Sequence, residues 1–266
     1  AGIPVEVVYY DEAHNATDSD NFPSVEKLSK IAKYNYFFTA TPKISRSRGG
    51  EASGMDNTDV YGEIICKVDF NVLREQGIIV LPKLRLLKTT ADTTIMSNDD
   101  VNNKTIRELI KKLETSNKVS KILVCANGTK SINTIIHNQV LVGWLRELGY
   151  DILSIDSVNG GYINGDIIKS KGEFISILND MGKDMDRKMI VLHHSMLGEG
   201  IDVKAFNELV FLRNSISEIF TTQAIGRVIR SCPGQKYGGV TVVEHESDTK
   251  QAKDMVKNVF DTLILA

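Results

Sequence analysis

The sequence lacks any long uninterrupted run of apolar residues and contains little cysteine. None of its apolar runs approaches the roughly 20 residues that a membrane-spanning helix needs, so we expect a soluble protein. Its three cysteines, Cys66, Cys125 and Cys232, are far apart and form neither a CxxC pair nor a Cys/His cluster with metal-ligand spacing. We therefore expect reduced thiols in an intracellular compartment, with the cytoplasm, the nucleus and a viral particle left open.

The sequence also lacks a strong excess of either charge. It has 32 Lys and Arg against 34 Asp and Glu, a net charge of −2, so it is not a polycation and any nucleic-acid surface must be local. The first residues, Ala1 to Val5, contain no basic stretch and are not a signal peptide. They also lack an initial Met and run at once into a strand pattern, so we expect further sequence upstream.

The arrangement of apolar residues predicts an α/β protein. After the domain boundary that we expect between Gly77 and Pro82, short apolar strand patterns alternate with helical ones, including predicted helices over Ile132–Leu148, Asp166–Leu178 and Ile216–Ile229. This alternation predicts a mainly parallel sheet covered by helices on both faces. Such sheets place ligand sites at the carboxyl ends of their strands.

Two adjacent carboxylates follow the first predicted strand, a buried strand over Val5–Tyr10. At this position Asp11 is suited to hold Mg²⁺ through water, and Glu12 to position or deprotonate an attacking water. The alternative is a solvated pair that begins a loop. The next strand ends in Thr39-Ala40-Thr41, and we expect its two hydroxyls to hydrogen-bond the acidic motif on the adjacent strand end.

A second group of candidate residues lies near the end of the chain. Gln223, Arg227 and Arg230 are spaced by four and three residues, which predicts that they share one face of a helix. Two guanidinium groups on one face suit a triphosphate and the charge that develops during phosphoryl transfer, although a solvated basic stripe is the alternative. Upstream, Gly198–Val203 contains two glycines that allow a backbone to approach a phosphate closely.

These segments resemble motifs II, III, V and VI of the superfamily 2 DEAD/DEAH helicases, in that family's order and across nearly the whole chain. The matching segments are Asp11-Glu12-Ala13-His14, Thr39-Ala40-Thr41, Gly198–Val203 and Gln223–Arg230. Glu218–Thr222 looks more like the DNA translocase branch, which includes type III restriction subunits and UvrB- and XPB-like proteins. The resemblance implies RecA-like parallel sheets covered by helices: a partial first lobe over 1–81 with motifs II and III, and a complete second lobe over 82–266 with motifs IV, V and VI.

The resemblance also implies roles for individual residues, with ATP and Mg²⁺ bound between the two lobes. Arg230 corresponds to the arginine finger and Arg227 to a further contact with the γ-phosphate. Gln223 corresponds to the partner through which His14 couples the lobes. The remaining implied roles are nucleotide contact by Gly200 and Asp202, and coupling of hydrolysis to lobe movement by Thr39 and Thr41.

A further segment, Lys121–Asn127, resembles motif IV and is followed by a helix start. Asn127, Gly128 and Thr129 lie where backbone N–H groups suit a phosphate of DNA or RNA, and an ordinary helix cap is equally open. The resemblance therefore implies a nucleic-acid-dependent ATPase that acts as a helicase or translocase.

One motif of that family is missing from the 266 residues. No GxxxxGK followed by Ser or Thr occurs, and this phosphate-binding loop precedes the DEAH box in the family. We therefore expect an upstream half that carries the loop, and little ATP binding by this chain alone. The alternatives are a non-catalytic motor remnant that serves as a binding or structural subunit, and the motor subunit of a restriction system.

Overall fold

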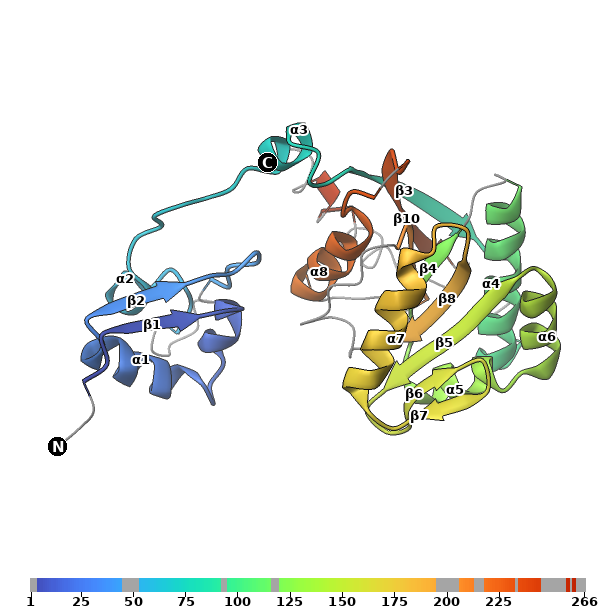
Figure 1. Cartoon of the computed structure of the whole chain (residues 1–266), viewed down its shortest axis with the longest axis horizontal. Helices are drawn as coiled ribbons and strands as arrows, with labels where there is room; N and C mark the ends of the chain where they lie inside the picture. The colour runs from blue at the N-terminus through green and yellow to red at the C-terminus, as the bar shows by residue number, and fades with distance from the viewer. Residues whose placement is uncertain are drawn as a thin grey trace. The chain divides into compact units, whose positions relative to one another are not determined.

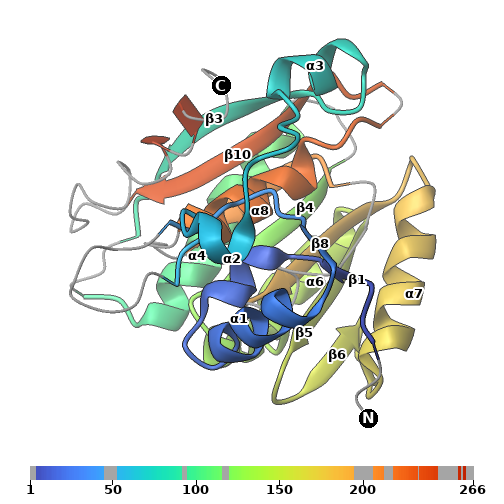
Figure 2. The same ribbon diagram turned by 90° about the vertical axis from the view of Figure 1, so that its left-hand side faces the viewer.

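The computed structural model divides into two compact units, Ala1–Val68 and Asp69–Ala266 (Figures 1 and 2). It describes residues 4–44, 53–91, 95–115, 120–194, 206–212, 218–232, 234–244, 257–258 and 260–261. The division precedes the expected boundary at residues 81 and 82. The reason is that the helix α3 (Phe70–Glu75) and the residues after it belong to the second unit, where Phe70 and Val80 pack against its core.

The first unit is a two-stranded parallel sheet with helices on one face. Its elements are β1 (Val7–Tyr10), a 3-10 turn (Ala13–Thr17), α1 (Phe22–Ile31), β2 (Tyr34–Phe37) and α2 (Thr58–Tyr61). The core of this unit contains Phe22 and Val25 of α1 and Tyr61 of α2. Tyr10 and Phe37 stack above them with ring centroids 4.4 Å apart. The strand predicted from Val5 to Tyr10 is therefore present.

The opposite face of this small sheet is apolar and exposed. Val7, Tyr9 and Phe38 are exposed by 40%, 69% and 53%, and the rings of Tyr9 and Tyr36 stack at 5.5 Å. The predicted burial of the first strand therefore holds for one face only. Parallel strands are normally covered on both faces, so exposed aromatic rings on this face are unusual for a parallel sheet.

The second unit contains an eight-stranded sheet in the order β3-β10-β9-β4-β8-β5-β6-β7. The six strands from β3 to β5 in this order run parallel, and β6 and β7 extend the sheet as antiparallel strands. The bounds are β3 (Leu81–Lys88), β4 (Lys121–Cys125), β5 (Tyr150–Asp156), β6 (Gly160–Ile163), β7 (Asp166–Ile168), β8 (Lys188–His193), β9 (Glu208–Phe211) and β10 (Tyr237–Glu244). The mainly parallel sheet predicted from the sequence is confirmed.

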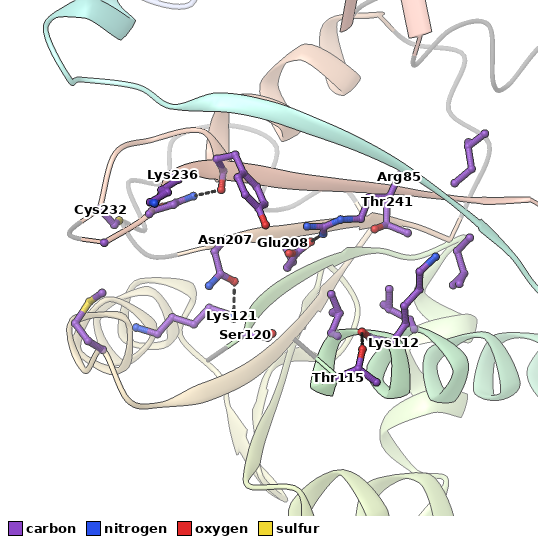
Figure 3. Close-up of a pocket in the computed structure, with 18 residues that line it drawn as sticks. Arg85, Lys112, Thr115, Ser120, Lys121, Asn207, Glu208, Cys232, Lys236 and Thr241 are labelled. Carbon is purple, nitrogen blue, oxygen red and sulfur yellow. Dashed lines mark hydrogen bonds and ion pairs between the residues drawn. The ribbon is translucent and has the colours of Figure 1, made fainter. Parts of the chain in front are cut away.

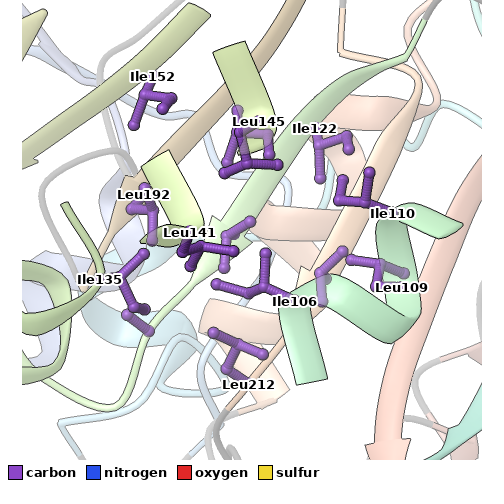
Figure 4. Close-up of a cluster of buried hydrophobic side chains, with 14 of the residues drawn as sticks. Ile106, Leu109, Ile110, Ile122, Ile135, Leu141, Leu145, Ile152, Leu192 and Leu212 are labelled. Carbon is purple, nitrogen blue, oxygen red and sulfur yellow. The ribbon is translucent and has the colours of Figure 1, made fainter. Parts of the chain in front are cut away.

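Helices cover both faces of this sheet. The first face carries α4 (Asn98–Glu114), α5 (Thr129–Ile136) and α6 (Gln139–Glu147), and the second carries α7 (Lys171–Lys183) and α8 (Glu218–Val228). In β4, Ile122 and Val124 point into the first core, drawn in Figure 4, whereas Leu123 and Cys125 point into the second. Within the described ranges, no helix is long and apolar enough to cross a lipid bilayer.

Two predicted helices of this unit differ from the structure. The helix predicted over Asp166–Leu178 is wrong at its start, because Asp166–Ile168 forms β7 and α7 begins only after Ser170, whose hydroxyl accepts the N–H of Glu173 at 3.3 Å. The helix predicted over Ile132–Leu148 is two helices. Its interruption is explained by Asn138, whose side chain caps α6 by accepting the N–H of Leu141 at 2.9 Å.

The last turn of α8 lies directly against the start of β10. A Cβ atom at Gly238 would fall inside the contact distance of the carbonyl oxygen of Val228 and would also touch Ile229. The side-chain amide of Gln235 donates to the same carbonyl at 2.8 Å. The absence of a side chain at Gly238 therefore determines how closely α8 approaches the sheet.

We predict that Gly238→Ala lowers the free energy of unfolding by about 1–3 kcal/mol, because the added methyl group overpacks rigid backbone. Gly143→Ala is the matched control, since Gly143 is exposed within α6 and a Cβ there meets nothing within 4 Å. It should raise stability by about 0.5–1 kcal/mol through helix propensity. Chemical denaturation measures both variants, and equal stabilities would contradict the packing described for α8.

Candidate functional site

The two candidate carboxylates lie in a tight turn at the end of β1. The backbone of Glu12 is left-handed, with φ 48° and ψ 47°, and its N–H donates to the Asp11 carboxylate at 2.9 Å. This conformation costs a residue other than glycine about 1–2 kcal/mol. Asp11 is exposed, and the side chain of Glu12 is 43% exposed, so both carboxylates reach solvent at the strand end.

The fourth residue of this tetrapeptide joins it to the next strand end. His14 is 3% exposed, and its Nδ1 lies 3.1 Å from the hydroxyl oxygen of Thr39 and 3.5 Å from that of Thr41. The same nitrogen lies 3.5 Å from a carboxylate oxygen of Glu12. The expected contact between the two segments is present within this unit, and it runs through the imidazole rather than directly to the carboxylates.

Backbone hydrogen bonds hold the same two segments in register. The N–H of Ala13 donates to the carbonyl of Phe38 at 2.9 Å, and the N–H of Thr41 donates to the hydroxyl of Thr39 at 3.1 Å. The Thr39 hydroxyl therefore lies between its own turn and the buried imidazole of His14. These bonds tie the two strand ends to each other.

In the second unit, Asn127, Gly128 and Thr129 follow the carboxyl end of β4, as predicted. Gly128 is the N-cap of α5 and offers no side chain to its first-turn N–H groups, while Asn127 is exposed. Nearby, Cys125 and His193, the last residues of β4 and β8, lie side by side with the thiol sulfur 3.3 Å from Nε2. Both are buried. No local sequence pattern indicates this contact, because it depends on how β4 and β8 pair.

The arginine-bearing segment is only partly helical, which corrects one expectation. Gln223 and Arg227 lie on α8, but this helix ends at Val228, so Arg230 does not share its face. Arg230 instead lies in an extended segment that forms an antiparallel bridge with Ile79. The spacing of Gln223, Arg227 and Arg230 could not reveal this extended segment, because Ile79, with which Arg230 pairs, lies far away in the sequence.

The burial of this segment separates its residues into two groups. Arg227 is 9% exposed, whereas Gln223 and Arg230 are half-buried. Gly200 and Asp202, with the rest of Gly198–Val203, lie outside the described residues. The structure therefore places Gln223, Arg227 and Arg230 at α8 and just beyond its end.

The described residues contain no group of three or more His, Cys, Asp or Glu side chains arranged to hold a metal ion. A Mg²⁺ ion bound through water needs only one or two carboxylates when phosphate oxygens and water supply its other ligands. The exposed carboxylate of Asp11, beside that of Glu12, fits this second kind of site.

A cavity of about 530 Å³ lies elsewhere, at the amino ends of β4, β9 and β10 (Figure 3). Three of its charged groups have structural partners: Arg85 forms an ion pair with Glu208 at 2.5 Å, and the Lys121 amine donates to the carbonyl of Gly182 at 2.8 Å. Burial lowers the pKa of Lys121, and nearby Asp184 partly offsets this effect. Because Asn127 follows the opposite end of β4, this cavity is separate from the start of α5.

No protein-family model and no curated protein matches this sequence. Among solved structures, the chain is similar to the ATP-dependent type ISP restriction-modification enzyme LlaBIII bound to DNA, with 18% identity and a TM-score of 0.68 over 98% of this chain. The chain spans 20% of the length of that enzyme. A weaker similarity is to the C-terminal part of the Fun30 ATPase domain, with 17% identity and a TM-score of 0.39 over 63% of this chain and 57% of that one.

The first of these similarities confirms the fold class. It extends over nearly the whole chain, and the eight-stranded sheet with helices on both faces is the arrangement expected of a RecA-like lobe. At 18% identity the likeness concerns the fold alone. At that level, the predicted α/β fold with a parallel sheet covered by helices is confirmed.

We predict that Glu12→Gly is more stable than Glu12→Ala by about 1 kcal/mol. Both variants lose the carboxylate, but only glycine adopts the left-handed conformation at φ 48° without steric cost. Hydrogen exchange of the Tyr34 and Phe38 amides, which lie in β2 and just beyond it, would report the stability of the first unit. An alanine variant as stable as the glycine variant would show that the turn is not strained.

Proposed function

We propose that this chain supplies the water-positioning carboxylate and the arginine finger of a nucleic-acid-dependent ATPase that acts as a helicase or translocase. The observation that carries the proposal is the tetrapeptide from Asp11 to His14 at a strand end, with its buried imidazole held by Thr39 at 3.1 Å. A RecA-like chain that also carries Arg227 on α8 and Arg230 just beyond its end has several of the residues that phosphoryl transfer uses.

Each residue of the first unit has a distinct part in this chemistry. Asp11 would hold Mg²⁺ through water, and the bound ion would neutralise charge on the phosphates. Glu12, whose side chain is 43% exposed, would orient the attacking water and accept its proton. His14 would couple a change in the conformation of this turn to Thr39 and Thr41, because its side chain is hydrogen-bonded to both hydroxyl groups.

The second unit would contribute the groups that stabilise the transferred phosphoryl. Arg230 would act as the arginine finger, and Arg227 as a further γ-phosphate contact. Gln223, Gly200 and Asp202 would contact the nucleotide or the coupling histidine. In this proposal the first unit is the C-terminal part of one RecA-like lobe and the second unit is the other lobe.

The phosphate-binding loop would come from polypeptide outside the 266 residues. Two observations support this part of the proposal: the sequence contains no GxxxxGK motif, and one face of the β1–β2 sheet exposes Val7, Tyr9 and Phe38. A parallel sheet that lacks a cover on one face would be completed by further strands and helices.

Nucleic acid is the second proposed partner. The start of α5 offers uncapped N–H groups beside Asn127, Gly128 and Thr129, and such groups suit a backbone phosphate. We favour DNA over RNA, because the similar restriction-modification enzyme is bound to DNA. The salt dependence of binding to matched DNA and RNA strands would separate the two.

A non-catalytic subunit is the alternative function, and the missing phosphate loop favours it. Hydrolysis of ATP by these 266 residues alone would exclude it, as would a phosphate loop in the same polypeptide. A motor subunit of a restriction system is a narrower form of the main proposal. It requires a nuclease in the same assembly, which a DNA-cleavage assay would detect.

We predict that Glu12→Gln and Arg230→Ala each lower nucleic-acid-stimulated ATP hydrolysis by about a thousandfold or more, because an arginine finger contributes roughly 10³–10⁵ to turnover. The measurement needs the protein that includes both this chain and the phosphate loop. Arg74→Ala, an exposed arginine on α3, is the control and should leave turnover unchanged. Normal turnover in either site variant would contradict the proposal.

We also predict that Tyr9→Thr and Phe38→Thr have different effects in two contexts. In the isolated 266 residues each should change the free energy of unfolding by less than about 0.5 kcal/mol, since both side chains are exposed. In the protein that carries the phosphate loop each should cost about 2–4 kcal/mol, as expected for buried aromatic rings. Equal effects in both contexts would mean that nothing covers this face.

A further inference from the structure

The segment that leads into the large sheet has a fixed shape at both ends. Asp69 caps α3 by accepting a first-turn N–H at 2.6 Å. At the other end Gly77 adopts φ 69°, its N–H donates to Arg74 O at 2.9 Å, and the N–H of Ile78 donates to Leu73 O at 2.9 Å. This 5→2 and 6→1 pattern is a Schellman motif, which turns the chain sharply in a defined direction.

After this turn, the segment pairs with the chain that leaves α8. Ile79 and Arg230 are directly opposed in an antiparallel bridge. The two hydrogen bonds on either side run from Val80 N–H to Ile229 O at 2.7 Å and from Ser231 N–H to Ile78 O at 3.0 Å. Ile79 and Arg230 are therefore a non-hydrogen-bonded pair, the type of antiparallel pair in which the two Cα atoms lie closer together. Their side chains are neighbours on the same side of the ribbon.

The neighbouring residues determine which side that is. Val80 packs against the core between α7, α8 and the sheet, and Ile229 is buried in the same core. Because side chains alternate along extended chain, Ile79 and Arg230 point away from this core together. The branched side chain of Ile79 is therefore placed to contact the aliphatic stem of Arg230, while the guanidinium group extends beyond it.

We infer that Ile79 is a positioning residue for Arg230, and that the segment from α3 to Val80 holds the arginine in its reactive orientation. The inference rests on the proposed function, because Ile79 has a positioning role only if Arg230 contacts the γ-phosphate. The chain that enters the second unit from the unit bearing Glu12 is the same chain that holds the arginine. The register of this segment therefore determines where the guanidinium group lies.

The test compares Ile79→Ala with Ile78→Ala in the protein that also carries the phosphate loop. Ile78 belongs to the same segment but is 52% exposed and does not oppose Arg230. We expect Ile79→Ala to lower kcat by about tenfold to a hundredfold with KM for ATP unchanged, because small misplacements of a catalytic group cost this much. Ile79→Val should restore most of the rate, and Ile78→Ala should resemble the unaltered protein.

A double-mutant cycle shows whether Ile79 acts through the arginine. In an Arg230→Lys background, Ile79→Ala should cause little further loss, whereas an equal loss in both backgrounds would overturn the inference. So would identical rates for Ile79→Ala and Ile78→Ala. If Arg230→Lys itself turns over ATP at the unaltered rate, the proposed function fails, and that outcome is distinct from failure of the Ile79 contact alone.

Hydrogen exchange on the unaltered chain tests the geometry without any variant. The amides of Val80 and Ser231 donate the two bonds that flank the bridge, so both should exchange slowly and at similar rates. Rapid exchange at either amide, on the scale of exposed loops, would show that the pairing does not persist and would overturn the inference.

Discussion

Parallel strands need cover on both faces, and this need organises both units of the chain. In the second unit α4, α5 and α6 cover one face and α7 and α8 the other, and alternate residues of β4 point into the two cores. The close packing of α8 depends on Gly238, where any side chain would meet the carbonyl of Val228. Among the described residues of the first unit, helices cover one face of the sheet, and aromatic side chains of β1 and β2 are exposed on the other.

The candidate chemistry follows from the same arrangement. Asp11 and Glu12 leave β1 at its carboxyl end, and Asn127 leaves β4 at the corresponding end of the larger sheet. The cavity at the opposite, amino ends of the strands contains charged groups that stabilise the fold, such as the ion pair of Arg85 and Glu208.

Local patterns were enough to predict much of this structure. The strands that end at Asp11 and near Thr39 were predicted because their apolar runs stop at the polar residues, and the parallel sheet was predicted from its alternation with helices. The break between α5 and α6 was missed because the cap formed by Asn138 outweighs an apolar period that continues through it. The hairpin at Asp166 was missed because two short strands carry almost no periodic signal.

The position of Arg230 shows a different limit. Its spacing from Gln223 and Arg227 predicted one helical face, yet its backbone pairs with Ile79, which no local pattern indicates. Likewise, the contact of Cys125 with His193 depends on the register of two strands that are far apart in the sequence. Pairings of this kind depend on tertiary structure, so a single sequence predicts which residues are present but not which of them meet.

The proposed function requires that Glu12 and Arg230 act on the same nucleotide. The most direct test is pulsed electron spin resonance between spin labels at Ser19 and Lys171, which are exposed on different units, with exposed Cys66 and half-buried Cys232 replaced by Ser. The protein must include the phosphate loop. We expect the distribution of distances between the two labels to be shorter and narrower with Mg²⁺ and a non-hydrolysable ATP analogue than without nucleotide. An unchanged distribution, with nucleotide binding verified, would contradict it.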